Sequence, residues 1–355
     1  MKTRHRSVVQ YLQPADGPFV SFTLAAILMA GSLATTVHAE DWRVLVGLES
    51  GTRGSQALAF LPNELWIHAG DTVRYTYPTH ERHTLTFLKP GQTRPPGFGP
   101  TFGVVVGCPG VTPDGSNYNG SACVTSDVLM LPEDSAPRDE PPTYSVTFPS
   151  TGNFKFVCLI HADMTGVVHV VAPSAPLPHT QNFYDREMRR DGERLLADAS
   201  SLGKERNSRS VESAGNVVAA GIGEVETSGA GSQTASLMRF LRRTIVVHVG
   251  DTVVWTSLDP SINHTVTFGA EPLDPRPASA NVSPTSDGAR EATIASTSDN
   301  VNSGFLSPTP QDRANLAQAN PGVTRFRVTF TVPGTFNYIC AVHDQLGMAG
   351  TVVVQ

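Results

Sequence analysis

Charged residues are scarce in this chain, and cysteines are scarcer still. Lysine, arginine, aspartate and glutamate make up only 16% of the 355 residues, with 26 basic against 32 acidic side chains. Binding to nucleic-acid phosphates needs clustered lysine and arginine, so a formal net charge of −6 argues against a nucleic-acid partner. The same acidity suits a protein partner with a basic face.

Glycine and proline, in contrast, are plentiful, with 31 and 27 residues. These residues are typical of short strands joined by many turns, which favours an all-β protein. A length of 355 residues exceeds one typical domain of roughly 100 to 200 residues, so we expect two domains.

The N-terminus has the order of a secretory signal peptide. Three basic residues within the first six positions precede an apolar run over residues 19–37, and small residues follow where a signal peptidase reads them. We expect residues 1–39 to be removed near Ala39 and the protein to be periplasmic or extracellular, with no retained membrane span. A retained membrane anchor is the alternative, although the run is near the lower length limit for crossing a bilayer.

The chain repeats itself at an offset of about 180 residues. Residues 60–73 and 240–253 both alternate apolar side chains before a Gly-Asp turn and resume after it, which is typical of two strands joined by a turn. Further matches along the chain move the offset only from 180 to 182. Such a steady offset indicates a duplication, so we predict two copies of one β fold, over residues 40–172 and 213–355.

Residues 173–212, between the two copies, have a different character. Three prolines mark a break, and Thr180 to Leu202 then places apolar side chains on one stripe among charged residues. This pattern predicts a helix, although Gly192 weakens it. We interpret the segment as a linker helix that packs on one domain.

Two of the four cysteines lie in a loop-like stretch. Cys108 and Cys123 are 15 residues apart among glycine, proline and serine, and in an exported protein such a pair predicts a disulfide. The stretch belongs to a long irregular segment, residues 88–142, whose counterpart is 269–322. Loops of this length in compact domains are usually functional or mobile.

The third cysteine opens a short motif in the first half. Cys158 is followed by His161 and Met164, and His83 precedes it by 75 residues. A thiolate and two imidazoles form a trigonal plane that suits both oxidation states of copper, and a long thioether contact completes the site. The pattern therefore predicts a type 1, or blue, copper ion bound by these four residues.

The second half repeats this motif with a longer loop. His264 lies 76 residues before Cys340, which is followed by His343 and Met348. We predict a second copper ion there. Zinc is the competing metal, but it favours a closed set of cysteine and histidine ligands and has no use for the thioether.

Other histidines compete for the ligand roles. His80 is the alternative to His83, and the repeat favours His83 because it aligns with His264. His68 and His248 are also paired by the repeat, but they precede the Gly-Asp turn on alternating segments, so we interpret them as ordinary strand residues.

Over nearly their whole length, about 130 residues each, the two halves resemble the cupredoxin family of blue copper proteins. The first Cys-x2-His-x2-Met is similar to the ligand loop of amicyanin, and the second Cys-x2-His-x4-Met resembles that of plastocyanin. The resemblance implies two Greek-key β-sandwiches in tandem, each with one copper ion. Thr84 and Thr265 depart from the asparagine that many members carry after the upstream histidine, which changes the group beside the thiolate and leaves the ligands intact.

The resemblance also implies electron transfer rather than catalysis. His161 and His343 would expose their imidazole edges to a redox partner, a cytochrome or a copper oxidoreductase. Multicopper oxidases and copper nitrite reductases also fuse cupredoxin domains, but they need additional histidines, commonly His-x-His pairs, and the 11 histidines here form none. Copper storage or delivery is the third class, and it usually relies on methionine- and histidine-rich tracts, whereas the 7 methionines here are scattered.

Overall fold

The computed structural model describes residues 39–95, 99, 108–135, 139–209, 215–228, 230–307 and 322–355. The predicted signal peptide lies outside these ranges except for its last residue, Ala39. No helix in the described ranges is long and apolar enough to cross a membrane.

The first half is built from strands. They are β1 (Asp41–Glu49), β2 (Ser55–Leu61), β3 (Glu64–His68), β4 (Thr72–Thr76), β5 (Thr86–Phe87), β6 (Ser116–Asn117), β7 (Val124–Thr125), β8 (Thr143–Thr147), β9 (Gly152–Val157) and β10 (Thr165–Val171).

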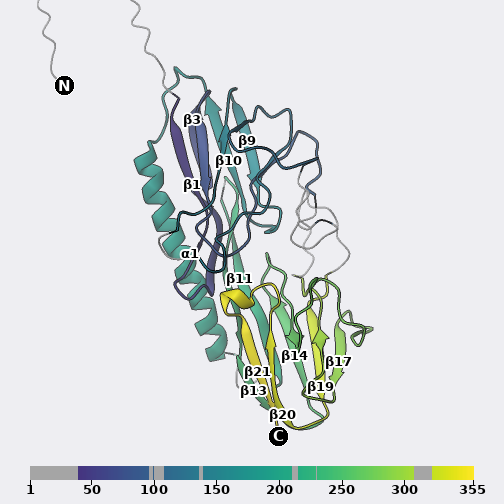
Figure 1. Ribbon diagram of the computed structural model, residues 1–355. Helices are drawn as coiled ribbons and strands as arrows, with labels where there is room; N and C mark the ends of the chain where they lie inside the picture. Colours follow the sequence, from purple (N-terminus) through teal and green to yellow (C-terminus); the bar gives the residue numbers. More distant parts are fainter. Residues whose placement is uncertain are drawn as a thin grey trace, which may run out of the picture. The chain divides into compact units, whose positions relative to one another are not determined.

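Helix α1 (Gln181–Arg209) separates these strands from those of the second half (Figure 1). The second half contains β11 (Val217–Thr227), β12 (Ser232–Leu241), β13 (Thr244–Val247), β14 (Thr252–Leu258), β15 (Thr267–Phe268), β16 (Ser283–Pro284), β17 (Arg290–Ile294), β18 (Val301–Asn302), β19 (Arg325–Phe330), β20 (Gly334–Ile339), the 3-10 turn η1 (Asp344–Leu346) and β21 (Ala349–Val354).

Each half is a sandwich of two sheets, which confirms the predicted all-β class. The order β3-β10-β9-β5-β7 forms one sheet of the first half, and β13-β21-β20-β15-β18 forms its counterpart in the second. Aromatic side chains fill the space between the layers: Phe60 of β2 meets Phe156 of β9 with ring centroids 4.7 Å apart. Likewise Phe240 of β12 meets Tyr338 of β20 at 4.7 Å. Burial of such rings is the main contribution to stability in each core.

The other layers of the two sandwiches are continuous with each other. Within the described residues they form a single sheet of 11 strands, in the order β16-β17-β19-β14-β11-β12-β2-β1-β4-β8-β6. The halves join where β2 pairs antiparallel with β12, with Leu58 opposite Thr234 and Ser55 opposite Leu237. We call this pairing the seam. The sequence predicted two domains but contained no sign of a shared sheet.

Helix α1 packs on strands of both halves, so the expectation that it covers one domain was wrong. It contacts β1 and β2 of the first half and β11 and β12 of the second, and Figure 1 shows it running alongside both. Its buried Leu195 and Ala199 form one apolar cluster with small side chains from each side of the seam, Ala57 and Ala235 among them. The helix therefore covers the face of the seam that would otherwise be exposed to solvent.

This double cover explains why every residue of β2 is buried. Ala57, Ala59 and Leu61 face the helix cluster, while Leu58 and Phe60 face the sandwich core. A strand with apolar cover on both faces has a continuous apolar pattern instead of an alternating one.

The helix is longer than predicted and continues through two glycines to Arg209. A Cβ atom at Gly192 would lie 2.7 Å from Leu48, and one at Gly203 would lie 2.5 Å from Leu237. Glycine lowers intrinsic helix propensity, but here it lets the helix backbone approach the strands. Tertiary packing thus overrides the local signal that weakened the prediction.

Asp259 is a buried acid next to the seam. It is 1% exposed, accepts a hydrogen bond from the Ser236 hydroxyl, and accepts the Ser261 N–H at 3.0 Å. Burial raises the pKa of Asp259 to about 6, because these hydrogen bonds only partly offset the loss of water around the carboxylate. The charged form of this side chain therefore costs folding free energy.

We predict that Asp259→Asn flattens the pH dependence of stability. A carboxyl with a raised folded-state pKa contributes its stability at low pH and loses it as the pH rises through about 6. The wild type should therefore lose roughly 2 kcal/mol relative to the variant between pH 4 and pH 7. Urea unfolding of the metal-free proteins at both pH values measures this difference, and parallel pH profiles would contradict it.

Candidate metal centres

The structure brings three of the predicted ligands of the first half together; we call this the first site. The Nδ1 atom of His161 lies 3.6 Å from Cys158 Sγ and 3.1 Å from Nδ1 of His83. The ligand atoms of all three residues lie within 4.8 Å of one another, and all three residues are buried. His83 enters from the segment before β5, and Cys158 follows the end of β9.

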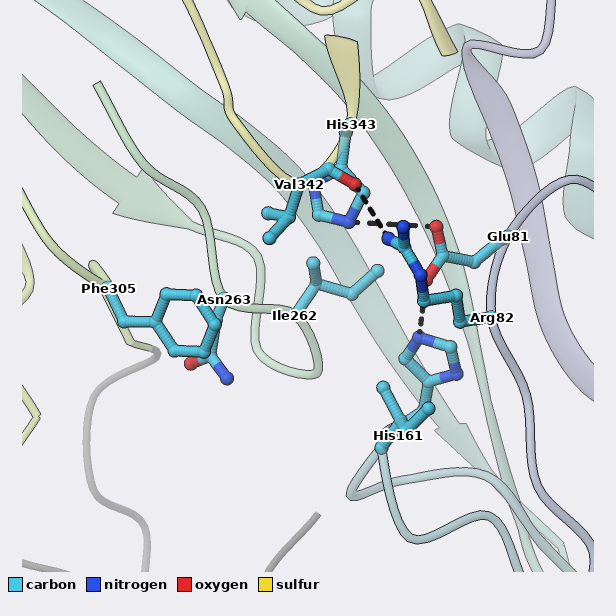
Figure 2. A pocket seen from close by; sticks show the side chains of 9 residues that line it. Glu81, Arg82, His161, Ile262, Asn263, Phe305, Val342 and His343 are labelled. Carbon is cyan, nitrogen blue, oxygen red and sulfur yellow. Dashed lines mark hydrogen bonds and ion pairs between the residues drawn. The ribbon is translucent and has the colours of Figure 1, made fainter. Parts of the chain in front are cut away.

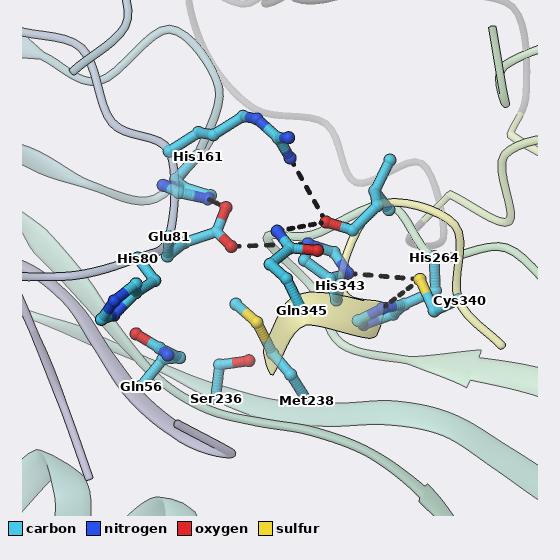
Figure 3. A network of polar contacts seen from close by, with 12 residues as sticks. Gln56, His80, Glu81, His161, Ser236, Met238, His264, Cys340, His343 and Gln345 are labelled. Atoms are coloured by element: carbon cyan, nitrogen blue, oxygen red, sulfur yellow. Dashed lines mark hydrogen bonds and ion pairs between the residues drawn. The ribbon is translucent and has the colours of Figure 1, made fainter. Parts of the chain in front are cut away.

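The second site has the same construction. Cys340 Sγ lies 3.3 Å from Nδ1 of His343 and 3.8 Å from Nδ1 of His264. Figure 3 shows a dashed line from the sulfur to each of the two rings. These three buried residues again hold their ligand atoms within 4.8 Å. The duplication seen in the sequence is therefore also a duplication of the two sites.

The predicted methionines close each ligand loop. Both Met164 and Met348 are fully buried. The Cys158 N–H donates to the Met164 carbonyl at 2.9 Å, and the Cys340 N–H donates to the Met348 carbonyl at 3.0 Å. The two additional residues of the second loop are accommodated by η1, which ends at Gly347 with a left-handed φ of 87°.

The threonines that depart from the family pattern hold the cysteines in place. The Thr84 N–H points at Cys158 Sγ at 3.4 Å, and its hydroxyl accepts the N–H of Leu159 at 2.7 Å. In the second site the Thr265 N–H points at Cys340 Sγ at 3.3 Å. A backbone donor aimed at sulfur stabilises the thiolate form that binds a metal.

Each upstream imidazole rests against a glycine in a β-bulge. The register of β1 with β2 shifts around Gly47, which has φ +78°, and that of β11 with β12 shifts around Gly221. A Cβ atom at Gly47 would lie 2.5 Å from Nε2 of His83, and one at Gly221 would collide with Nε2 of His264. Sequence reasoning missed both glycines, although each occupies a similar place in its half.

Arg94, which contacts the ligand loop of the first site, is another residue that the sequence did not reveal. Its guanidinium donates to the carbonyls of Ala162 at 2.8 Å, of His161 at 3.0 Å and of Cys158. Three carbonyls of the first ligand loop are thus held by one buried side chain. The only signal was an arginine in a loop rich in proline and glycine.

The ligand loops also reach across to the opposite half. Ser261 of the second half donates to Asp163, which lies between His161 and Met164, at 2.9 Å. Arg82 of the first half donates to the carbonyl of Val342, next to His343, at 3.3 Å. The two sites therefore face each other across one interface.

Glu81 lies between the two sites. One carboxylate oxygen is 3.3 Å from Nε2 of His161, and the other is 3.6 Å from Nε2 of His343. Figure 2 shows the carboxylate between the two rings, with an ion pair drawn to each. A cavity of about 20 Å³ beside these groups has room for about one water molecule.

This arrangement contradicts the expectation that the loop imidazoles are exposed electron ports. His161 is 1% exposed and His343 is 4% exposed. Their outer edges face the Glu81 carboxylate inside the protein, because each half contacts the ligand loop of the other.

Electrostatics differ between the two sites. In the first site burial works to raise the pKa of Cys158, but the charges and hydrogen bonds of His161 and His83 hold that pKa well below its usual range. Burial also works to lower the pKa of His161, but the Cys158 thiolate and Glu81 raise it to about 10. The metal-free first site is thus a thiolate paired with an imidazolium.

In the second site burial has the largest effect on the pKa values of the ligands. It raises the pKa of Cys340 to about 11 and lowers the pKa of His343 to about 4. Burial likewise lowers the pKa of both upstream imidazoles, His83 and His264. Three of the four imidazoles are therefore neutral at pH 7, which is the form that binds a metal.

The donor set suits a soft transition metal. Each site offers one sulfur and two Nδ1 atoms that converge in a buried space. A thiolate with two imidazoles is the trigonal set of type 1 copper, and the neighbouring methionine is its usual axial ligand. The residues present therefore fit copper.

The competing histidines lie elsewhere. The Nδ1 atom of His80 is 2.6 Å from a carboxylate oxygen of Glu49, so this imidazole is engaged away from Cys158. Nε2 of His68 lies 2.9 Å from the Ala175 carbonyl, and His248 is on the surface. The remaining two cysteines, Cys108 and Cys123, form a disulfide.

A family model matches the second half of the chain. Residues 226–355 match the model of a family described as copper binding proteins, plastocyanin/azurin family. No curated protein sequence matches the chain significantly. A reduced mutant of amicyanin is 19% identical over 37% of this chain and 82% of its own, with a TM-score of 0.22. Oxidised plastocyanin from Dryopteris crassirhizoma is 19% identical over 39% of this chain and 99% of its own, with a TM-score of 0.21.

We predict that Gly47→Ala removes metal binding from the first site only, because the new Cβ displaces the His83 ring. The variant should bind one metal ion per chain instead of two in a titration followed by metal analysis. Gly221→Ala should do the same to the second site.

Gly70→Ala is the matched control for backbone strain. Gly70 also has a left-handed φ, +103°, but a Cβ atom added there would meet nothing within 4 Å. This variant should keep both metal ions. If Gly47→Ala still binds two metal ions, the glycine of the bulge is not needed to position the His83 imidazole.

Proposed function

We propose that this chain is a blue copper protein with two sites that carries electrons between redox partners, because residues 226–355 match the model of the plastocyanin/azurin family of copper binding proteins. The observation that carries the proposal is the pair of buried Cys/His/His sites, built alike in both halves. The first half repeats the second in sequence and in site geometry.

The ligands of the first copper would be His83, Cys158, His161 and Met164. Those of the second would be His264, Cys340, His343 and Met348. Copper bound in such a set supplies one-electron chemistry with little change of geometry between its two oxidation states.

The residues around each site hold the ligands in fixed positions and exclude water from them. The bulge glycines support the upstream imidazoles, and the threonine N–H groups support the thiolates. Arg94 holds the first ligand loop by its carbonyls. A site whose ligands cannot move costs little reorganisation when an electron arrives, because the protein has already adopted the required geometry.

Partner and location are part of the proposal. We propose export, which the basic and apolar N-terminus supports and with which the disulfide of Cys108 and Cys123 agrees. The partner would be a redox protein, either a cytochrome or a copper oxidoreductase. Since both loop imidazoles are buried, electrons must enter by another part of the surface.

We predict that the purified protein, loaded with copper, binds two ions per chain and shows intense visible thiolate-to-copper absorption. Cys158→Ser and Cys340→Ser should each remove about half of this absorption and one copper ion. A redox titration with copper quantification measures both. A colourless protein with tightly bound zinc, or two coppers without redox activity, would contradict the proposal.

A further inference from the structure

A single carboxylate contacts a ligand imidazole from each half of the chain. Glu81 is 3% exposed, and its two oxygens lie 3.3 Å from His161 Nε2 and 3.6 Å from His343 Nε2. Both rings direct their other nitrogen, Nδ1, toward the cysteine of their own site, at 3.6 Å and 3.3 Å.

The duplication does not explain this carboxylate. Glu81 precedes His83 by two residues, and the residue that precedes His264 by two is Ile262. Ile262 lines the same small cavity as Glu81 but offers no acceptor. One half therefore supplies the polar group that both sites use.

The chemistry of the contact decides which nitrogen carries the proton. An ionised carboxylate can only accept hydrogen bonds, so an imidazole nitrogen facing it has to be the N–H. With the proton on Nε2, a neutral ring presents the lone pair of Nδ1. In metal sites, a hydrogen bond of this kind orients the ring and raises the affinity for the metal.

We infer that Glu81 is a positioning residue for both metal centres at once, fixing Nδ1 of His161 and of His343 as the nitrogen left for the metal. The inference rests on the proposed function only in that these imidazoles are metal ligands; it does not require the metal to be copper. It makes the two sites one linked unit, since a change at Glu81 reaches both.

The test measures the two sites separately. Cys340→Ser leaves the first site, and Cys158→Ser leaves the second. In each background Glu81→Met replaces the carboxylate with an apolar side chain of similar length. Co²⁺ is titrated against the thiolate-to-cobalt absorption, and the affinity should fall by roughly 10- to 100-fold in both backgrounds.

Ile262→Met is the matched control, because it alters the same cavity without removing the contacts of Glu81 with the two imidazoles. It should leave both Co²⁺ affinities unchanged. Glu81→Gln keeps one acceptor oxygen and should spare at most one site. If Glu81→Met lowers the affinity in one background only, or in neither, the shared role of Glu81 is overturned.

A second measurement does not depend on any variant folding. In the metal-free wild type His161 is an imidazolium with a proton on both nitrogens, so nitrogen-15 NMR at pH 7 tests the neutral ring of His343, which should carry its proton on Nε2 and none on Nδ1. A proton on Nδ1 of His343 would overturn the inference. Neither experiment involves electron transfer, so a failure of the proposed electron-carrier function would be seen separately, in the redox titration.

Discussion

The antiparallel pairing of β2 with β12 is the contact on which the rest of the described structure depends. It joins an edge of each sandwich into one sheet, so neither strand remains as an open edge. At its centre Gln56 lies opposite Ser236, its equivalent in the repeat. Antiparallel pairing of equivalent strands relates the two halves by an approximate two-fold rotation, which places equivalent loops opposite each other.

The position of the metal sites follows from this pairing. The ligand loops meet across the interface, where Asp163 and Val342 each receive a hydrogen bond from the other half. An imidazole edge that would be exposed in a single domain is thereby buried. Glu81 supplies the carboxylate that both buried edges face, 3.3 Å from Nε2 of His161 and 3.6 Å from Nε2 of His343.

The approximate two-fold symmetry does not extend to the electrostatics of the two sites. Glu81 approaches His161 more closely than His343, and it raises the pKa of His161 together with the Cys158 thiolate. In the second site burial prevails and keeps the imidazole of His343 neutral. Two sites with the same ligand types thus have different charge states before any metal binds. The ligand loops also differ in length, because Met348 is two residues further from its histidine than Met164.

The sequence by itself determined the fold class and the Cys/His/His group of each site. Alternating apolar residues, a constant repeat offset and the spacing of Cys158, His161 and Met164 depend on local geometry, which a linear pattern records. Only the tertiary structure decided what surrounds the sites. Contacts between segments far apart in the chain produce the seam and the helix across it. They also produce the close approach of Gly47 and Gly221 to the upstream imidazoles and the role of Glu81. Neither the alternation of a strand nor the spacing of a ligand loop determines which edge strands pair with each other. The sequence therefore contained no pattern from which these features could be predicted.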